Sequence, residues 1–342
     1  MLLPLLLLAA APLPAQEGFD TSPAKELEKF APLLGNWRGE GTMTEPSGVV
    51  TKWSGHGTYQ KALGGHFVSE DFVFDFEGLS TPIVYHAYLG WDREQQRYVS
   101  VVTDNNGDVR LDESWFAPDG AMVQLKKHHR IDVPYVERAV TRVAGDELTM
   151  TMDMLMSEGA AFTVAEGKLR RCDEVCEPRF DTAGFMGMAP GAEMQRLGRL
   201  AAVYDLDGQM VMMPGAPMQK ITGTDTYRAV FGGNVMFATT LGVAEGSPDK
   251  YESHAFWGWN AHNRCIDCVF VDNMGSVGSM QVRWVGDKLV STSAGLMMGQ
   301  PTTQHFVVEL DGDGRCKTGV GHTTFGTMPP FESFRASYSP RK

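Results

Sequence analysis

Residues 86–92 read HAYLGWD and residues 254–260 read HAFWGWN, so one short segment of the chain occurs twice. The apolar spacing of residues 26–43 also recurs in residues 193–210. Further pairs match at a nearly constant offset: Thr58-Tyr59 with Thr226-Tyr227, Gly64-Gly65 with Gly232-Gly233, and Asp104-Asn105 with Asp272-Asn273. Such self-similarity indicates a tandem duplication of one structural unit.

The repeated segment has the two-residue period of a β-strand. His86 and Tyr88 fall on one face, and the opposite face carries Ile83, Tyr85, Ala87, Leu89 and Trp91. Turn sequences such as that of residues 104–107 follow at short intervals, which favours an antiparallel meander. We therefore expect an all-β protein in which each copy closes into an up-and-down barrel of about eight strands. A short amphipathic helix is expected before each barrel.

The composition bounds the possible functions. The chain has 342 residues, of which 43% are hydrophobic, enough to give two domains a core each. Its 30 Lys and Arg against 42 Asp and Glu leave a net charge of −12. This charge repels nucleic acids and anionic lipids, so neither is expected as a partner. The sequence also lacks a phosphate-binding loop, a dinucleotide fingerprint and a Gly-x-Ser-x-Gly motif, which argues against common enzyme classes.

The first fifteen residues resemble a signal peptide, because residues 1–15 are apolar and end in small residues before the polar Gln16-Glu17. The run is too short to span a bilayer as a helix, and no later stretch has about 18 uninterrupted apolar residues. We therefore expect a secreted or periplasmic protein without a transmembrane segment. The expected domains are a first barrel at 25–171, a linker interrupted by Pro and Gly at 172–191, and a second barrel at 192–342.

Several motifs together resemble the uncharacterised bacterial family DUF1579: the opening Leu33–Gly41, which reads LLGNWRGEG, then Gly64-Gly65, Leu89–Asp92, Tyr98 and Asp104. The resemblance extends over both copies. It is looser in the second, where Tyr204 replaces Trp37, Asn260 replaces Asp92 and Ile266 replaces Tyr98. The resemblance implies two tandem calycin- or lipocalin-like antiparallel barrels and no established activity.

The same opening is similar to that of nitrobindin-like heme barrels, in which a histidine on the closing strand binds the iron. The corresponding strands here, residues 162–170 and 331–338, contain no histidine. We therefore expect no heme, and the sequence indicates no other cofactor.

Two histidine and aspartate pairs recur in both copies and are the candidate catalytic residues: His86 with Asp104, and His254 with Asp272. Histidine titrates near neutral pH, and a carboxylate on the next strand could orient it as a general base. A structural role is the alternative, because Asp-Asn-x-Gly is a hairpin sequence in which the aspartate bonds its own backbone.

Aromatic and thioether side chains are the candidate ligand-binding residues: Tyr59, His86, Tyr88, Trp91, Met150, Met152 and Met154. The three methionines alternate along one expected strand and could form an adaptable apolar wall. The same pattern also arises where side chains fill a small barrel completely. Thioethers suit Cu(I), but neighbours on one strand face lie about 7 Å apart, so no metal site is predicted.

Cys172 and Cys176 are expected to form a small disulfide-closed loop in preference to a zinc site, because an exported protein meets an oxidising environment. All these observations favour an exported protein that binds a small, mainly apolar ligand or a partner protein. A hydrolase or isomerase using a histidine and aspartate pair is one alternative, and a structural envelope protein is another. The sequence indicates neither the ligand nor the oligomeric state.

Overall fold

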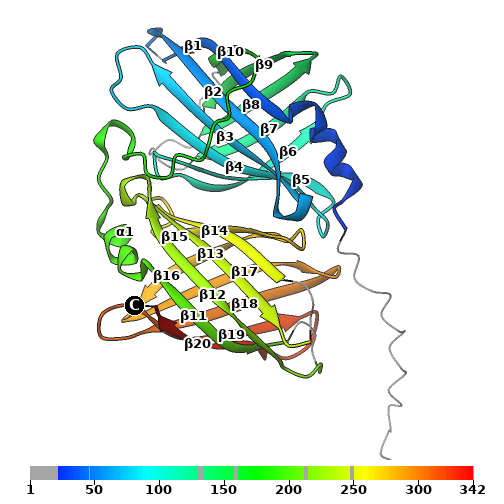
Figure 1. The fold of residues 1–342 in the computed structure, drawn as a ribbon, viewed down its shortest axis with the longest axis vertical. Helices are drawn as coiled ribbons and strands as arrows, with labels where there is room; N and C mark the ends of the chain where they lie inside the picture. The colour runs from blue at the N-terminus through cyan, green and yellow to red at the C-terminus, as the bar shows by residue number, and fades with distance from the viewer. Residues whose placement is uncertain are drawn as a thin grey trace, which may run out of the picture.

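In the computed structural model the chain forms two closed antiparallel barrels of ten strands each (Figure 1). The structure describes residues 22–45, 47–128, 135–156, 161–211, 215–246 and 250–341. The prediction of two tandem antiparallel barrels is therefore confirmed. The predicted signal peptide, residues 1–15, lies outside the described residues.

The first barrel is a meander that closes where its first strand pairs with its last. A 3-10 helix, η1 (Lys25–Leu33), precedes it, and a 3-10 turn, η2 (Leu63–Gly65), separates its second and third strands. The strands are β1 (Gly35–Thr44), β2 (Val50–Ala62), β3 (Phe67–Phe76), β4 (Ile83–Asp92), β5 (Arg97–Asp104), β6 (Val109–Phe116), β7 (Met122–His128), β8 (Tyr135–Ala144), β9 (Glu147–Met156) and β10 (Ala161–Cys172).

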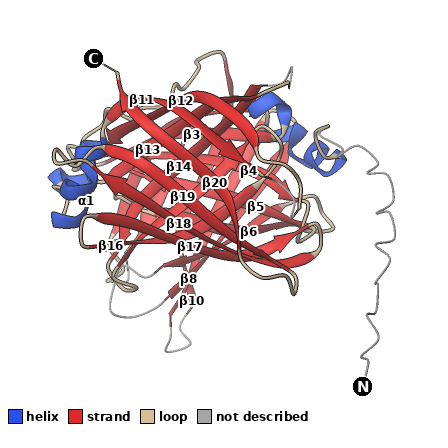
Figure 2. Ribbon diagram, turned by 90° about the horizontal axis from the view of Figure 1, so that it is seen from below, coloured by secondary structure: helices blue, strands red, loops and turns tan. Residues whose placement is uncertain are grey.

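The second barrel repeats this plan and closes by pairing β11 with β20. It follows η3 (Phe185–Gly187), α1 (Ala192–Leu197) and η4 (Gly198–Leu200), and the helical segments lie at the periphery of the strands (Figure 2). The remaining elements are β11 (Ala202–Met210), β12 (Gln219–Val230), η5 (Phe231–Gly233), β13 (Val235–Ala244), β14 (Lys250–Asn260), β15 (Cys265–Asp272), β16 (Val277–Val285), β17 (Lys288–Met297), β18 (Gln300–Leu310), β19 (Cys316–Phe325) and β20 (Phe331–Pro340).

The expected number of strands, about eight in each barrel, is wrong. Some hairpins lack the glycine-rich signal by which turns are recognised in a sequence. The turn between β4 and β5 reads Arg-Glu-Gln-Gln, and Gln96 there has a φ of 51°. Its counterpart in the second barrel, Arg264, has a φ of 50°. Both turns use the left-handed conformation without a glycine, so composition alone does not reveal them.

The short helices pack against the barrels, as expected. Phe30 and Leu33 of η1 are buried in the first core. The Trp37 indole donates a hydrogen bond of 2.7 Å to the carbonyl of Leu33. In the second barrel the Tyr204 hydroxyl donates one of 2.9 Å to Leu200, again four residues earlier. The replacement of Trp by Tyr therefore keeps a polar tip that satisfies the end of the helix.

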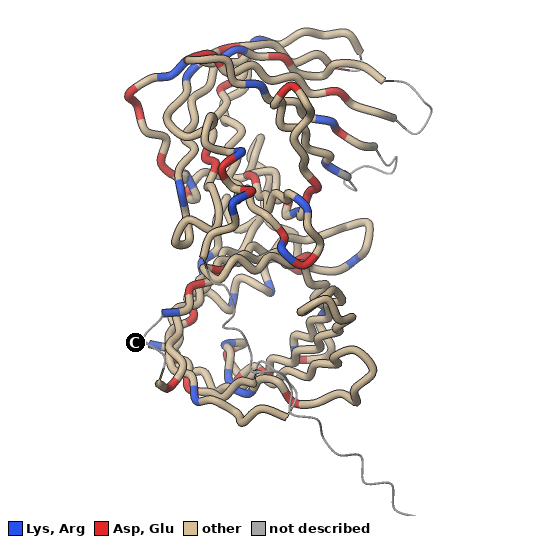
Figure 3. Tube along the Cα trace, turned by 90° about the vertical axis from the view of Figure 1, so that its right-hand side faces the viewer, with Lys and Arg blue, Asp and Glu red and all other residues tan. Residues whose placement is uncertain are grey.

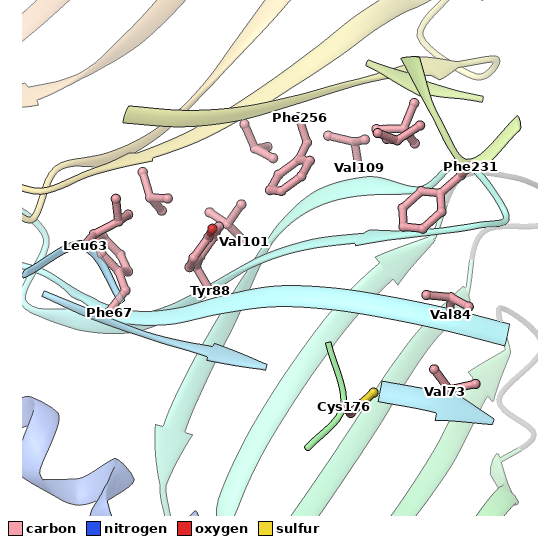
Figure 4. Close-up of a cluster of buried hydrophobic side chains, with 14 residues drawn as sticks. Leu63, Phe67, Val73, Val84, Tyr88, Val101, Val109, Cys176, Phe231 and Phe256 are labelled. Atoms are coloured by element: carbon pink, nitrogen blue, oxygen red, sulfur yellow. The ribbon is translucent and has the colours of Figure 1, made fainter. Parts of the chain in front are cut away.

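The two barrels meet through a shared hydrophobic cluster, which we call the junction (Figure 4). Its buried residues come from η2 and β3 to β6 of the first barrel and from β12 to β15 of the second, with Cys176 from the linker. The linker residue Phe180 packs against this cluster, and its ring lies 5.1 Å from that of Phe237. The linker is therefore part of the packing between the barrels.

Charged residues of both signs are interspersed over the outer strands of the two barrels (Figure 3). Among the described residues, no helix is long and apolar enough to cross a membrane.

Candidate functional site

The alternation of β4 divides the predicted ligand-binding residues between two places. Tyr85 and Leu89 point into the first barrel, where they pack in its core. Tyr88, on the opposite face, belongs to the junction. His86 lies on that same outer face and its ring is 5.0 Å from Phe180 of the linker. The interior of the first barrel and the junction are thus separate candidate sites.

One wall of the first barrel's interior is apolar. The ring of Trp53 meets that of Phe74 edge to face at 5.3 Å, and Phe74 stacks on Phe72 at 5.5 Å. Met150 packs against this core, as its position on the strand predicts. Met152 and Met154 follow on the same face of β9 and stay partly exposed, as Phe74 does. The barrel's own side chains therefore leave part of this wall uncovered.

Glu70 places a carboxyl group inside this apolar surrounding. The hydroxyl of Tyr59 donates a 2.7 Å hydrogen bond to Oε1, and that of Tyr85 donates a 3.4 Å bond to Oε2. Burial raises the pKa of Glu70 to about 6, against the lowering effects of the Tyr59 hydrogen bond and the charge of Lys126. Glu70 is not among the site residues predicted from the sequence. Its signal is its even-numbered spacing from Phe72 and Phe74, which puts all three on one face.

The opposite wall of the interior is polar. Lys126 Nζ lies 5.6 Å from the centre of the Tyr85 ring. The Ser100 and Ser114 hydroxyls are 2.9 Å apart, and the Gln124 amide donates to Ser100 at 2.9 Å. Lys126 and these neutral groups face the aromatic and methionine wall, on which the Glu70 carboxyl lies. The interior is therefore two-sided, with an apolar face and a hydrogen-bonding face.

The predicted pairing of His86 with Asp104 does not occur. His86 Nδ1 lies 2.6 Å from Asp71 Oδ1 on the neighbouring strand, and both side chains are buried. Asp104 Oδ1 accepts the backbone N–H groups of Asn106 at 2.9 Å and Asp108 at 3.2 Å. This is the structural alternative drawn from the hairpin sequence, in which the aspartate bonds its own turn.

His254 and Asp272 are likewise engaged separately. Asp272 Oδ1 accepts the backbone N–H groups of Met274 and Ser276, each at 2.9 Å. The Tyr88 hydroxyl lies 2.5 Å from His254 Nδ1, and His254 Nε2 lies 3.0 Å from a Glu252 carboxylate oxygen. Burial lowers the pKa of His254, which favours the neutral ring that this arrangement requires.

At the junction, equivalent positions of the two copies contact each other. His86 and His254 are equivalent in the two copies, and Tyr88 is equivalent to Phe256. The His86 ring lies 5.4 Å from Phe256, and the Tyr88 ring lies 5.6 Å from His254. The same face of each barrel therefore contacts its counterpart, with the reciprocal contacts of a two-fold arrangement.

The remaining predicted site residues have local partners. The Trp91 ring packs edge to face on Tyr98 at 4.8 Å. Cys172 and Cys176, expected to form a disulfide, are both free thiols in the structure, and Cys176 is buried. The backbone N–H of Cys176 donates to the Thr58 hydroxyl at 2.7 Å, which fixes the start of the linker on the first barrel.

A groove of about 1160 Å³ opens beside the junction, between β6 of the first barrel and β15 to β18 of the second. Polar side chains of both barrels line it, among them Glu113, Asn234, Asp267, Gln281 and His305. None of the predicted ligand-binding residues contributes to it. Apolar side chains such as Leu111, Trp259 and Met280 line it as well.

Comparison with protein families gives a match over the first barrel. Residues 22–171 match the family described as "Protein of unknown function (DUF1579)", and a second barrel of similar size follows. Among curated proteins the comparison found no match.

Three solved structures are similar in fold. Rv2717c from M. tuberculosis is 17% identical, with a TM-score of 0.32, over 44% of this chain and 99% of that one. The S-type phycobiliprotein lyase CPES from Guillardia theta is 13% identical, with a TM-score of 0.33, over 47% and 99%. A protein of unknown function of the DUF3598 family from Nostoc punctiforme is 9% identical, with a TM-score of 0.28, over 93% and 100%.

Proposed function

We propose that this chain, whose first barrel belongs to the DUF1579 family, binds a small amphiphilic molecule inside that barrel. The supporting observation is the two-sided interior, in which the Glu70 carboxyl, bonded by Tyr59, lies beside a wall of Phe and Met side chains. Enclosed apolar surface with a few convergent polar groups is the usual character of a small-molecule site.

The chemistry of the two walls defines the ligand class. The apolar part of the ligand packs against Phe74 and the methionines of β9, which adapt to its shape because the thioether chain is flexible. Its polar end bonds Glu70 and the tyrosine hydroxyls. Since Lys126 already offsets the charge of Glu70, a neutral hydroxyl or amide group suits this end better than an ammonium group.

Native mass spectrometry of the untagged mature chain tests the proposal first. We expect an excess mass that denaturation releases, corresponding to a small organic molecule. The apolar wall is then tested by fluorescence titration with N-phenyl-1-naphthylamine as the probe. Met152→Lys should weaken probe binding about tenfold or more, because it introduces a charge into the apolar wall.

The matched control is Thr151→Lys, the next residue of the same strand, whose side chain points to the other face. It should bind the probe as the unmodified chain does. Equal binding by both variants, or weakening by both to the same extent, would contradict a ligand site inside the first barrel.

We also propose that the protein is exported. The apolar residues 1–15, followed by polar residues, support cleavage after Ala15. N-terminal sequencing of the protein from the producing cells should begin at Gln16. A mature protein that keeps Met1, or that fractionates entirely with the cytoplasm, would contradict export.

A further inference from the structure

The interior of the second barrel carries a buried carboxyl group at a different place from that of the first. Ala238 stands where the first copy has Glu70, and Asp225 stands where it has Gly57. Asp225 pairs across the sheet with Tyr204 on one side and Thr240 on the other, so it shares the inward face of Tyr204. Only 6% of Asp225 is exposed.

Asp225 lacks a complete set of partners. Its Oδ1 has no hydrogen-bond partner among the described residues. Burial raises its pKa to about 6, and the only opposing effect is a hydrogen bond with the Thr240 side chain. No basic side chain of the described ranges forms an ion pair with it, in contrast to the influence of Lys126 on Glu70. A buried carboxylate destabilises the fold when one oxygen lacks a hydrogen-bond donor and no positive charge lies nearby. A bound molecule that supplies the donor and the charge removes this penalty.

Aromatic rings surround this carboxyl group. The Tyr227 ring lies 5.8 Å from Tyr204 and 6.2 Å from Trp257, and Tyr338 lies 6.2 Å from Tyr204. Burial, and after it the negative charge of Asp225, raises the pKa of Tyr227 and of Tyr338, so both lie close to the carboxylate. Tyr227, Trp257 and Tyr338 all stay partly exposed although they point inward.

We propose that the interior of the second barrel is a binding site for a small organic cation, such as a protonated amine. The ammonium group pairs with Asp225, and the body of the molecule lies against the rings of Tyr227 and Trp257. The negative faces of aromatic rings attract a cation, most strongly where water is excluded. An ion pair with the ligand supplies the counter-charge that the barrel itself lacks.

A second unpartnered group refines the ligand class. The indole Nε1 of Trp257 is buried and has no acceptor among the described residues. An indole N–H only donates, so it favours a ligand that also carries a hydroxyl, ether or carbonyl oxygen. The site therefore suits amines with a hydrogen-bond acceptor a few bonds from the nitrogen.

Calorimetric titration of the Met152→Lys chain, in which the proposed first-barrel site is blocked, with phenethylamine, tetramethylammonium and 2-phenylethanol tests the charge requirement of the second barrel. At least one of the two cations should bind, and 2-phenylethanol, the neutral analogue of phenethylamine, should bind at least tenfold more weakly. Asp225→Asn keeps the shape of the side chain and should lower the affinity for the cation at least tenfold. Asp207→Asn, the same change at an exposed carboxyl of β11, should leave it unchanged.

The aromatic contribution is measured separately. Trp257→Leu should weaken phenethylamine binding severalfold, because the ring is lost. Trp257→Phe keeps a ring and should retain most of the affinity, because phenethylamine has no acceptor for the indole N–H.

The pH dependence gives an independent readout. The other titratable groups near the Asp225 carboxylate are Tyr204, Tyr227, Tyr251, Tyr338 and Cys316, and burial raises the pKa of each, so all stay neutral near pH 7. Asp272, which accepts a 3.3 Å hydrogen bond from Tyr251, is a carboxyl whose pKa burial also raises. The pH profile is therefore compared with that of Asp225→Asn, which keeps Asp272 and lacks the Asp225 titration. Affinity for the cation should be constant between pH 8 and 7 and fall about tenfold per unit well below pH 6.

Three results would overturn the inference: no binding of either cation, equal binding of the alcohol, or unchanged affinity in Asp225→Asn. The proposal does not depend on the function of the first barrel. Because the cation titrations use the Met152→Lys chain, binding in the first barrel does not contribute to them, and failure of either proposal leaves the other standing.

Discussion

The Tyr88 hydroxyl of the first barrel lies 2.5 Å from His254 Nδ1 of the second, inside the junction. His254 Nε2 lies 3.0 Å from a Glu252 carboxylate oxygen, which can only accept a hydrogen bond when it is ionised. The histidine proton therefore resides on Nε2, and the tyrosine donates to Nδ1. The neutral ring joins the two barrels through one directional chain of hydrogen bonds.

Tyr88→Phe should destabilise the protein by about 1–3 kcal/mol, because it leaves Nδ1 of the partly buried His254 without a donor. Urea unfolding followed by fluorescence measures this loss. The control is Tyr98→Phe, which removes a 3.1 Å bond to the Glu26 carbonyl within the first barrel alone. Only Tyr88→Phe should increase hydrogen exchange in β14, and the same exchange in both variants would contradict a bond across the junction.

Glu70→Gln should change how stability depends on pH. Because the pKa of Glu70 is raised by folding, the folded state binds its proton more tightly than the unfolded state does. The unmodified chain therefore gains stability from this group as the pH falls through about 6. The free energy of unfolding of Glu70→Gln minus that of the unmodified chain should therefore fall by about 2 kcal/mol as the pH is lowered from 7.5 to 4.5.

This difference isolates Glu70, since His254 and Asp225 titrate in both proteins and their effects cancel. Unfolding curves in urea at several pH values provide the measurement. A difference in stability that stays constant over this range would show that Glu70 is not the buried acid described here.

The aromatic residue near the start of each barrel, Trp37 in the first and Tyr204 in the second, should stabilise the two copies by similar amounts. Trp37→Phe and Tyr204→Phe each remove the hydrogen bond that satisfies the end of the preceding helix. Each should lower the free energy of unfolding by roughly 1–3 kcal/mol. Tyr204→Trp keeps a hydrogen-bond donor, so it should destabilise the protein less than Tyr204→Phe if the larger ring is accommodated. Thermal unfolding compares the variants, and an unaffected Tyr204→Phe would remove the parallel between the copies.

Thiol labelling should distinguish one cysteine from the others. Burial raises the pKa of Cys176 and Cys265 to about 11 and that of Cys316 to about 12, and it raises the pKa of Cys268 further. The thiolate is the reactive form, so these four should label slowly in the native protein. Cys172, which is partly exposed, should label first.

Labelling also tests the predicted disulfide between Cys172 and Cys176. If the exported protein forms it, its intact mass will be lower by two hydrogens and Cys172 will not label before reduction. A rapidly labelled Cys172 in protein from the producing cells would exclude that bond.

The sequence predicted the architecture well because the relevant signals are periodic. The duplication fixes two units, and the alternation along β4 correctly puts Tyr85 and Tyr88 on opposite faces. The alternation along β9 likewise puts Met150 in the first core. These predictions need no knowledge of what lies next to each strand.

The partners of the candidate residues could not be predicted in this way. Alternation gives the face of His86 but not its neighbour, so Asp71 and Asp104 were equally available as partners until the register was known. The junction did leave a signal, because Val99, Val101 and Val102 of β5 are all buried, on both faces of the strand. A strand that is apolar on both faces indicates a covered outer surface.

The reciprocal contacts of His86 with Phe256 and of Tyr88 with His254 make the junction self-terminating. Since each copy contacts the other through the same face, pairing buries this face on both copies. Neither copy then has the face available to bind a third barrel and extend a fibre. The linker also keeps the two faces at a fixed effective concentration, so the pair does not separate on dilution as two free subunits would. Each copy can then change its own interior, as Glu70 and Asp225 show, while the pairing stays intact.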